Sequence, residues 1–199
     1  MNSRKWVRLF LTTLGIGGIT TALAGFIIRW SEYEKLFIEF KIGELFAVLV
    51  WFIGFGFIFS VVSQMGFFAY LTVHRFGLGI FRSVALWNSV QIVLIAFVLF
   101  DLIYFRYQLF AKDGESIISY ILIALGILLV GVIVAVVKRQ QTNKEAFIPS
   151  LFFMTVVTII EWFPALRIND ENWLYLMLIP LLVCNAYQLL ILHKLTKDA

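Results

Sequence analysis

Six apolar segments, separated by short charged connections, organise the whole chain. They cover residues 9–28, 45–73, 84–104, 117–137, 146–166 and 174–192. A helix needs about 20 apolar residues to cross the hydrocarbon core of a bilayer, and each segment is about that long or longer. The pattern therefore predicts an all-α, polytopic membrane protein: one membrane-embedded helical domain over residues 1–199 with about six transmembrane helices.

Composition supports the lipid bilayer as the surroundings of this chain. Its residues are 62% hydrophobic and only 14% charged, whereas soluble domains are nearer one half apolar and one quarter charged. The single cysteine, Cys184, excludes an internal disulfide and a metal site built on a cysteine pair. No basic cluster with interleaved aromatic residues occurs, so we expect no nucleic-acid partner.

The first segment has two interpretations. A basic start, an apolar run and the Ala-Leu-Ala of residues 22–24 resemble a cleavable signal peptide, which would leave five spans. The apolar run, however, continues to Ile28 and reaches the length of a full span. We therefore favour a retained first helix.

Lysine and arginine set the orientation, because short cytoplasmic loops are enriched in them. With a cytoplasmic N-terminus, the inner segments hold the larger set: Arg4, Lys5, Arg8, Arg75, Arg82, Lys138, Arg139, Lys144, Lys194 and Lys197. The outer segments hold the smaller set: Arg29, Lys35, Lys41, Arg106, Lys112 and Arg167. We expect both termini to be cytoplasmic.

Amide side chains inside the apolar segments predict a polar layer in the cytoplasmic half of the bilayer. Asn88 and Gln91 repeat the Asn-x-x-Gln spacing of Asn185 and Gln188, and this spacing puts each pair on one helix face. Gln64, with Ser60 and Ser63 near it, should lie at a similar depth. The layer is interpreted either as hydrogen bonding between helices or as a ligand pocket or two-state switch.

Two acidic residues, Asp101 and Glu161, are predicted at matched depth near the outer ends of the third and fifth segments. Ionisable residues at membrane depth are candidates for function. The alternatives are a proton or cation site and simple pairing with Arg29, Arg106 or Arg167 at the outer surface.

Small residues recur every four positions in the first segment, at Thr13, Gly17, Thr21 and Gly25. Such a stripe lets two helix backbones approach closely. It indicates packing inside the bundle, and a homodimer contact is the alternative.

Enzyme signatures are missing from the sequence. It has no H-E-x-x-H motif, no phosphate-binding P-loop and no G-x-S-x-G elbow. The two histidines, His74 and His193, each precede a basic residue at a predicted cytoplasmic helix end, and two histidines alone make a poor metal site. We expect no catalytic residues, no cofactor and no metal.

The second segment is too long for a simple span. Residues 45–73 would form a helix of about 43 Å against about 30 Å of hydrocarbon. We expect this helix to bend near Gly66 or to project into the cytoplasm. Residues 74–82 then form a short loop that is both basic and apolar, as is typical of an interfacial or partner-docking segment. The alternative is a plain re-entry turn at the lipid headgroups.

Three stretches resemble one known family: FSVVSQMGFFAYLTVHRFGLGIFRS (residues 59–83), SRKWVRLFLTTL near the N-terminus and NAYQLLILHKL near the C-terminus. They are similar to the KbaA family, the KinB-signalling pathway activation proteins of spore-forming Bacillus relatives. The resemblance implies a multi-pass cell-membrane protein that promotes the activity of a membrane sensor histidine kinase in the phosphorelay that starts sporulation.

A contact with such a kinase would use exposed cytoplasmic residues. The length, charge and aromatic content of residues 70–82 suggest the following candidates: Tyr70, His74, Arg75, Phe76, Phe81 and Arg82. The alternative function is a small transporter or channel that uses the polar layer.

Overall fold

The computed structural model describes residues 3–111 and 115–196, and within these residues the protein is helical with no β-strand. In this described part of the chain, five helices are long and apolar enough to cross a membrane. They are α1 (Ser3–Ile28), α3 (Ile42–Phe81), α4 (Val84–Phe110), α5 (Ile118–Gln141) and α9 (Glu171–Thr196). A short helix, α2 (Trp30–Ile38), joins α1 to α3. The predicted all-α class is confirmed.

The fifth predicted span, residues 146–166, is not one helix. A 3₁₀ turn (Lys144–Ala146) leads into α6 (Phe147–Phe152), a π-helical turn (Phe153–Val157), α7 (Thr158–Glu161) and α8 (Phe163–Ile168). Pro164 stands at the start of α8. A proline there cannot continue the preceding helix, because it lacks an N–H and its ring clashes with the carbonyl four residues earlier. The structure thus has five long helices and one broken segment where six continuous spans were predicted.

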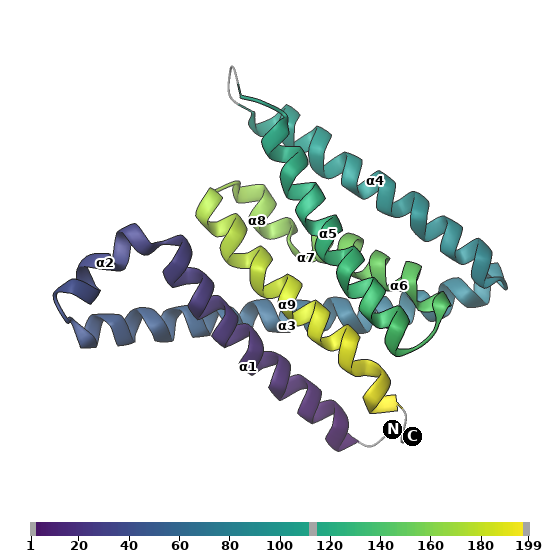
Figure 1. Ribbon diagram of the computed structural model, residues 1–199, viewed down its shortest axis with the longest axis horizontal. Helices are drawn as coiled ribbons and strands as arrows, with labels where there is room; N and C mark the ends of the chain where they lie inside the picture. The colour runs from purple at the N-terminus through teal and green to yellow at the C-terminus, as the bar shows by residue number, and fades with distance from the viewer. Residues whose placement is uncertain (1–2, 112–114, 197–199) are drawn as a thin grey trace.

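Helix α3 is longer than predicted and shows no break at Gly66. It runs for 40 residues, about 60 Å at 1.5 Å per residue, and it crosses the other long helices obliquely (Figure 1). The predicted loop over residues 74–82 is helical as far as Phe81. The chain then turns at Arg82, which has a left-handed backbone (φ 50°), and Ser83 caps α4 by accepting from the backbone N–H of Leu86 (3.3 Å).

The connections alternate between two ends of the molecule. One end holds the α1–α2–α3 connection, the end of α4, the start of α5 and the α8–α9 connection (Figure 1). The other end holds the start of α1, the end of α9, the α3–α4 turn and the α5–α6 connection (Figure 1). Near the termini, the Lys5 ammonium donates to the backbone oxygen of Leu195 (3.5 Å). The N- and C-terminal helices therefore end side by side.

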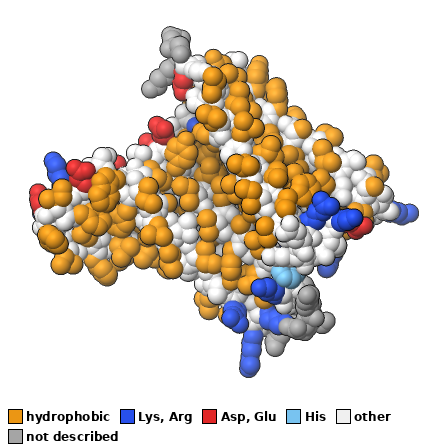
Figure 2. Space-filling model, in the orientation of Figure 1, with side chains coloured by type: hydrophobic (Ala, Val, Ile, Leu, Met, Phe, Trp, Pro, Cys, Tyr) orange, Lys and Arg blue, Asp and Glu red, His pale blue; other side chains and the backbone are white. Residues whose placement is uncertain are grey.

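On the face shown in Figure 2, apolar side chains cover most of the middle of the molecule. Lys and Arg gather mostly at the end that carries the termini, and Asp and Glu mostly at the opposite end (Figure 2). Large apolar side chains are well exposed, among them Ile27 (75%), Leu109 (73%) and Leu129 (61%). An apolar surface of this extent needs an apolar environment, which agrees with helices that lie in a bilayer.

The small residues of α1 pack against α3 within the same chain. Thr13 and Thr21 are fully buried, and Gly17 lies directly against Gly56, where an added Cβ on Gly56 would be 2.5 Å from the Gly17 carbonyl oxygen. This close approach is possible only without side chains. The stripe therefore serves packing inside the chain and offers no surface to a second copy.

Candidate functional site

Five buried side chains from three helices form one hydrogen-bonded group, called here the buried polar cluster. Its members are Ser63 of α3, Thr158 and Glu161 of α7, and Asn185 and Gln188 of α9. The Ser63 hydroxyl donates to Asn185 Oδ1 (2.6 Å) and accepts from Gln188 Nε2 (2.7 Å). Asn185 Nδ2 donates both to Thr158 Oγ1 (2.9 Å) and to Glu161 Oε2 (2.6 Å). Asn185 is thus the centre of the cluster.

Helical spacing and a glycine on α3 bring these residues together. Asn185 and Gln188 are three residues apart on α9, as are Thr158 and Glu161 on α7, so each pair shares a helix face. On α3, Gly66 leaves room for the Glu161 carboxyl, whose Oε1 lies where a Cβ of residue 66 would be. A larger residue at 66 would force this carboxyl away.

Hydrogen bonding in the cluster is incomplete. Glu161 is 6% exposed and the other four residues 0%, yet Glu161 Oε1 and Gln188 Oε1 are buried without a partner among the described residues. Glu161 also forms no ion pair with any residue that the structure describes. The cluster therefore offers two free acceptor oxygens and an acid without a counter-charge, a combination that is costly in an apolar medium.

The predicted polar layer is brought together only in part. Asn185 and Gln188 meet through Ser63, but Gln64 and Gln91 are buried at 4% and 0% exposure with amide atoms that find no partner among residues 3–111 and 115–196. Asn88 is half-buried, and its Oδ1 is likewise unpaired within those residues. Thr158 was not predicted, although its three-residue spacing from Glu161 is the same signal that pointed to the two Asn-x-x-Gln pairs.

The position predicted for Glu161 is not the one observed. It was expected near the outer surface, level with Asp101 and beside arginines, but it bonds to Asn185, near the middle of α9. Glu161 is the last residue of α7, directly before the break at Trp162, and its carboxyl lies against Gly66 of α3.

The arginines expected to pair with Asp101 and Glu161 form no ion pair with either acid among the described residues. Asp101 is half-buried and forms no ion pair with a described residue. Arg106 instead donates to Asn169 Oδ1 from Nε (3.1 Å) and Nη2 (3.0 Å), and its guanidinium lies over the ring of Trp162 (6.0 Å). Arg29 pairs with Glu32 of α2 (3.7 Å). The two acids therefore do not form one site in the described structure.

The second candidate region is the C-terminal part of α3, where one side of the helix is fixed against the bundle. Tyr70 is buried and its hydroxyl donates to the Pro149 carbonyl (2.8 Å). His74 Nδ1 accepts from Trp87 Nε1 (3.0 Å), and the half-buried Phe81 stacks on the same indole (5.6 Å between centroids). Of the candidate contact residues, Tyr70 is therefore inside the protein, and His74 and Phe81 already contact Trp87.

The opposite side of this segment is open. Val73, Phe76 and Ile80 are 48%, 66% and 74% exposed, and their spacing of three and four residues puts them on one face. Arg75 and Arg82 are also exposed. These five residues, Val73, Arg75, Phe76, Ile80 and Arg82, are called here the α3 exposed face.

Comparison with known proteins assigns the chain to a family. The family model described as "KbaA: KinB-signalling pathway activation in sporulation" matches residues 17–195. The chain belongs to the KbaA family. A relative from Bacillus subtilis (strain 168), named "KinB-signaling pathway activation protein", is 54% identical over 194 residues, which is 98% of each chain. No solved structure matches the chain significantly.

The KbaA match covers both candidate regions. It includes the whole of α3, the broken fifth segment and α9 down to Leu195. The resemblance that the sequence showed is therefore confirmed, as are sporulation and KinB signalling as its setting. The description of the family names a pathway and no functional residues.

Proposed function

We propose that this KbaA-family chain is a multi-pass membrane protein that promotes signalling by a KinB-type sensor histidine kinase at the start of sporulation, without catalysing a reaction itself. The name of the family and that of the Bacillus subtilis relative support the pathway. The five long apolar helices support the membrane location. The absence of catalytic motifs in the sequence supports action through contact.

The proposed topology has six crossings, with the broken segment α6–α8 as the fifth and both termini in the cytoplasm. An even number of crossings agrees with chain ends that lie side by side and with connections that alternate between two ends (Figure 1). The end that carries the termini is the more basic one (Figure 2). Because lysine and arginine favour the cytoplasmic side, that end is assigned to the cytoplasm.

The contact with the kinase is assigned to the α3 exposed face. Its apolar side chains, Val73, Phe76 and Ile80, suit packing against a transmembrane or juxtamembrane helix of a partner. Arg75 and Arg82 suit headgroup phosphates or acidic residues at the membrane surface. The exposure of Phe76 on a helix whose other side is held by Tyr70 and Trp87 is the observation that carries this assignment.

Activation requires unequal contact with two states of the kinase. A partner that binds both states equally shifts nothing, and a shift from 1:99 to 99:1 requires a difference of about 5.5 kcal/mol. The α3 exposed face would supply this difference by packing on one arrangement of the kinase helices and not on the other.

The test replaces Phe76 and Ile80 by alanine together, in a strain whose only copy of the protein is the variant. The control is Leu129→Ala on α5, which removes a similarly exposed apolar side chain (61%) far from α3. At equal protein level in the membrane, we expect spore counts and phosphorelay-dependent reporter expression to fall about tenfold or more with the double variant, because interface hot spots contribute about 2 kcal/mol or more. The control should leave both at the level of the unaltered protein. Normal sporulation with the double variant would refute the contact surface.

The second candidate function is a small transporter or channel, favoured by the uncompensated carboxyl of Glu161 in the buried polar cluster. Flux of protons or monovalent cations into liposomes that contain the purified protein distinguishes the two. The activator proposal expects no flux above that of empty liposomes, whereas flux that disappears in Glu161→Gln would favour transport.

A further inference from the structure

Lys138, near the C-terminal end of α5, is a lysine held inside the protein. Its side chain is only 6% exposed, and its ammonium donates to the backbone carbonyl of Leu189 on α9 (2.6 Å). It forms no ion pair with any residue that the structure describes. An ammonium offers three donors, so one carbonyl leaves most of its hydrogen-bonding capacity and all of its charge uncompensated.

Lys138 also lines a cavity of about 290 Å³ between α3, α4, α5, α6 and α9. Lys138, His74 and Asn143 contribute polar groups to its lining, and Leu71, Leu78 and Val84 contribute an apolar wall. Because His74 Nδ1 accepts the indole N–H of Trp87, the neutral ring carries its proton on Nε2 and can donate a second hydrogen bond. The lining is therefore amphipathic, with two donors on its polar side.

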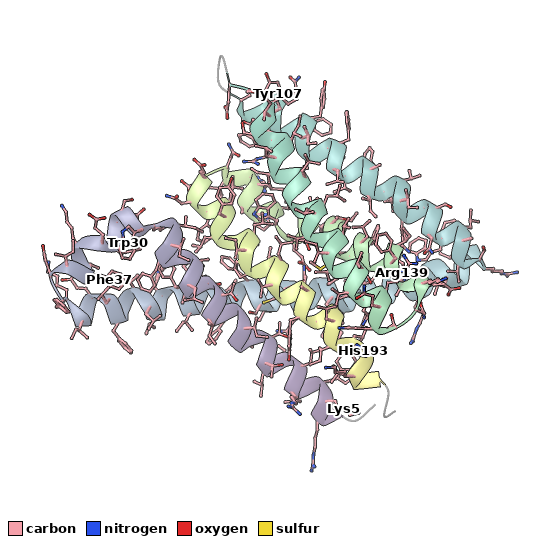
Figure 3. All side chains as sticks on the ribbon, in the orientation of Figure 1. Lys5, Trp30, Phe37, Tyr107, Arg139 and His193 are labelled. Carbon is pink, nitrogen blue, oxygen red and sulfur yellow. The ribbon has the colours of Figure 1, made fainter. Side chains whose placement is uncertain are left out.

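Charges around the cavity favour an anion. The cavity lies at the basic end of the molecule, where Figure 3 places Arg139, His193 and Lys5, and Lys144 stands two residues before its lining residue Ala146. One carboxylate, Glu145, is also in the lining, but it is exposed and does not pair with Lys138. In the proposed topology this end meets the inner leaflet, whose anionic lipids attract basic groups.

We propose that this cavity binds the headgroup of an anionic phospholipid of the inner leaflet. The lipid phosphate accepts from the Lys138 ammonium and from His74 Nε2, and an acyl chain lies along Leu71, Leu78 and Val84. This occupant matches both halves of the lining, because a free phosphate would leave the apolar wall uncovered. The α5–α9 contact at Lys138 then depends on lipid as well as on protein.

The experiment measures lipid binding to the purified full-length protein in a neutral detergent by native mass spectrometry, with titration of phosphatidylglycerol, phosphatidylcholine or inorganic phosphate. Lys138→Met removes the charge and keeps the length of the side chain. Arg139→Met is the matched control, since it removes the same charge from the adjacent, exposed residue. We expect the unaltered protein to prefer phosphatidylglycerol over phosphatidylcholine, Lys138→Met to bind phosphatidylglycerol about tenfold or more weakly, and Arg139→Met to bind it within about twofold of the unaltered protein.

A second variant keeps the proposal testable if Lys138→Met does not fold. Leu78→Trp narrows the cavity from its apolar wall and leaves Lys138 in place, and it should weaken phosphatidylglycerol binding as well. Equal binding of phosphatidylglycerol by the unaltered protein and by a folded Lys138→Met or Leu78→Trp variant would overturn the proposal. So would equal affinity for phosphatidylcholine, or inorganic phosphate that displaces the lipid at comparable concentration.

Discussion

The central position of Asn185 in the buried polar cluster leads to a quantitative prediction. Asn185→Leu keeps the shape of the side chain and removes three hydrogen bonds, one from Ser63 and one each to Thr158 and Glu161. Side-chain hydrogen bonds between helices in a membrane contribute about 0.6 kcal/mol on average and about 1.7 kcal/mol at most. The three together give a loss of about 2 to 5 kcal/mol in the free energy of unfolding.

The matched control is Asn88→Leu. Asn88 is the same residue type in the same predicted polar layer, but its Oδ1 has no partner among the described residues. Its replacement removes no bond seen in the structure and should change the free energy of unfolding by less than about 0.5 kcal/mol. The sequence alone predicts the same role for the two asparagines, so a difference between the two variants in the free energy of unfolding tests the hydrogen bonds of Asn185.

Unfolding of both variants can be followed by circular dichroism during titration of mixed micelles with a denaturing detergent. The cluster also predicts that Ser63→Ala costs less when Asn185 is already leucine than in the unaltered protein, because the shared bond is then gone. If Asn185→Leu is no more destabilising than Asn88→Leu, or if the Ser63 and Asn185 effects simply add, the cluster is not a bonded unit.

Three further outcomes follow from close contacts in the bundle. Gly66→Ala should lower the free energy of unfolding by about 1 kcal/mol or more despite the better helix propensity of alanine, because the new Cβ meets the Glu161 carboxyl. The control is Gly54→Ala, which should be neutral or stabilising because nothing lies within 4 Å of its Cβ. The same result at both positions would contradict the contact between Gly66 and Glu161. Gly56→Ala should be worse than Gly66→Ala in the same unfolding assay, because its Cβ meets backbone rather than a side chain that can move. Tyr70→Phe should cost about 0.6 kcal/mol through its lost bond to a backbone carbonyl and leave sporulation counts unchanged, since this hydroxyl is inside the protein; a sporulation defect at normal protein level would contradict that assignment.

The all-helical class and five of the six expected long helices followed from the hydrophobic pattern, because long apolar runs can form little else in a membrane. The break in the fifth segment could not be seen in that pattern, since the residues of a broken segment are as apolar as those of a straight one. Pro164 was the available signal, and it marks the start of α8. The exact end of α3 was also missed: residues 74–82 were expected to form a loop, whereas α3 continues to Phe81 and Gly77 packs against Trp87 inside the helix.

The sequence predicted which candidate residues share a face of one helix, but not which residues of different helices meet. Spacing paired Asn185 with Gln188 on one face, but no pattern within α9 could show that Ser63 and Glu161 would complete the cluster. The position of Glu161 was missed because its contacts with Asn185 on α9 and with Gly66 on α3 cannot be read from the pattern of the fifth segment alone.

The burial of Lys138 could have been predicted from helical spacing, but the orientation argument counted it only as a basic loop residue. Gly131, Val134, Ala135 and Lys138 are all buried, and their spacing of three and four residues is the inward face of an amphipathic helix. The same lysine also belongs to the basic inner set by position. A charged residue in register with a buried stripe is thus a candidate for an internal site even when it lies near a helix end.

The most direct test of the proposed kinase contact is photo-crosslinking from α3 in living cells. A photoreactive amino acid at position 76, which is exposed, should give a crosslinked product that contains the KinB-type kinase, whereas the same amino acid at the exposed position 129 of α5 should not. Sporulation with the position-76 variant shows that the protein still works. Normal sporulation with no kinase crosslink from position 76, or equal crosslinking from positions 76 and 129, would contradict contact through the α3 exposed face.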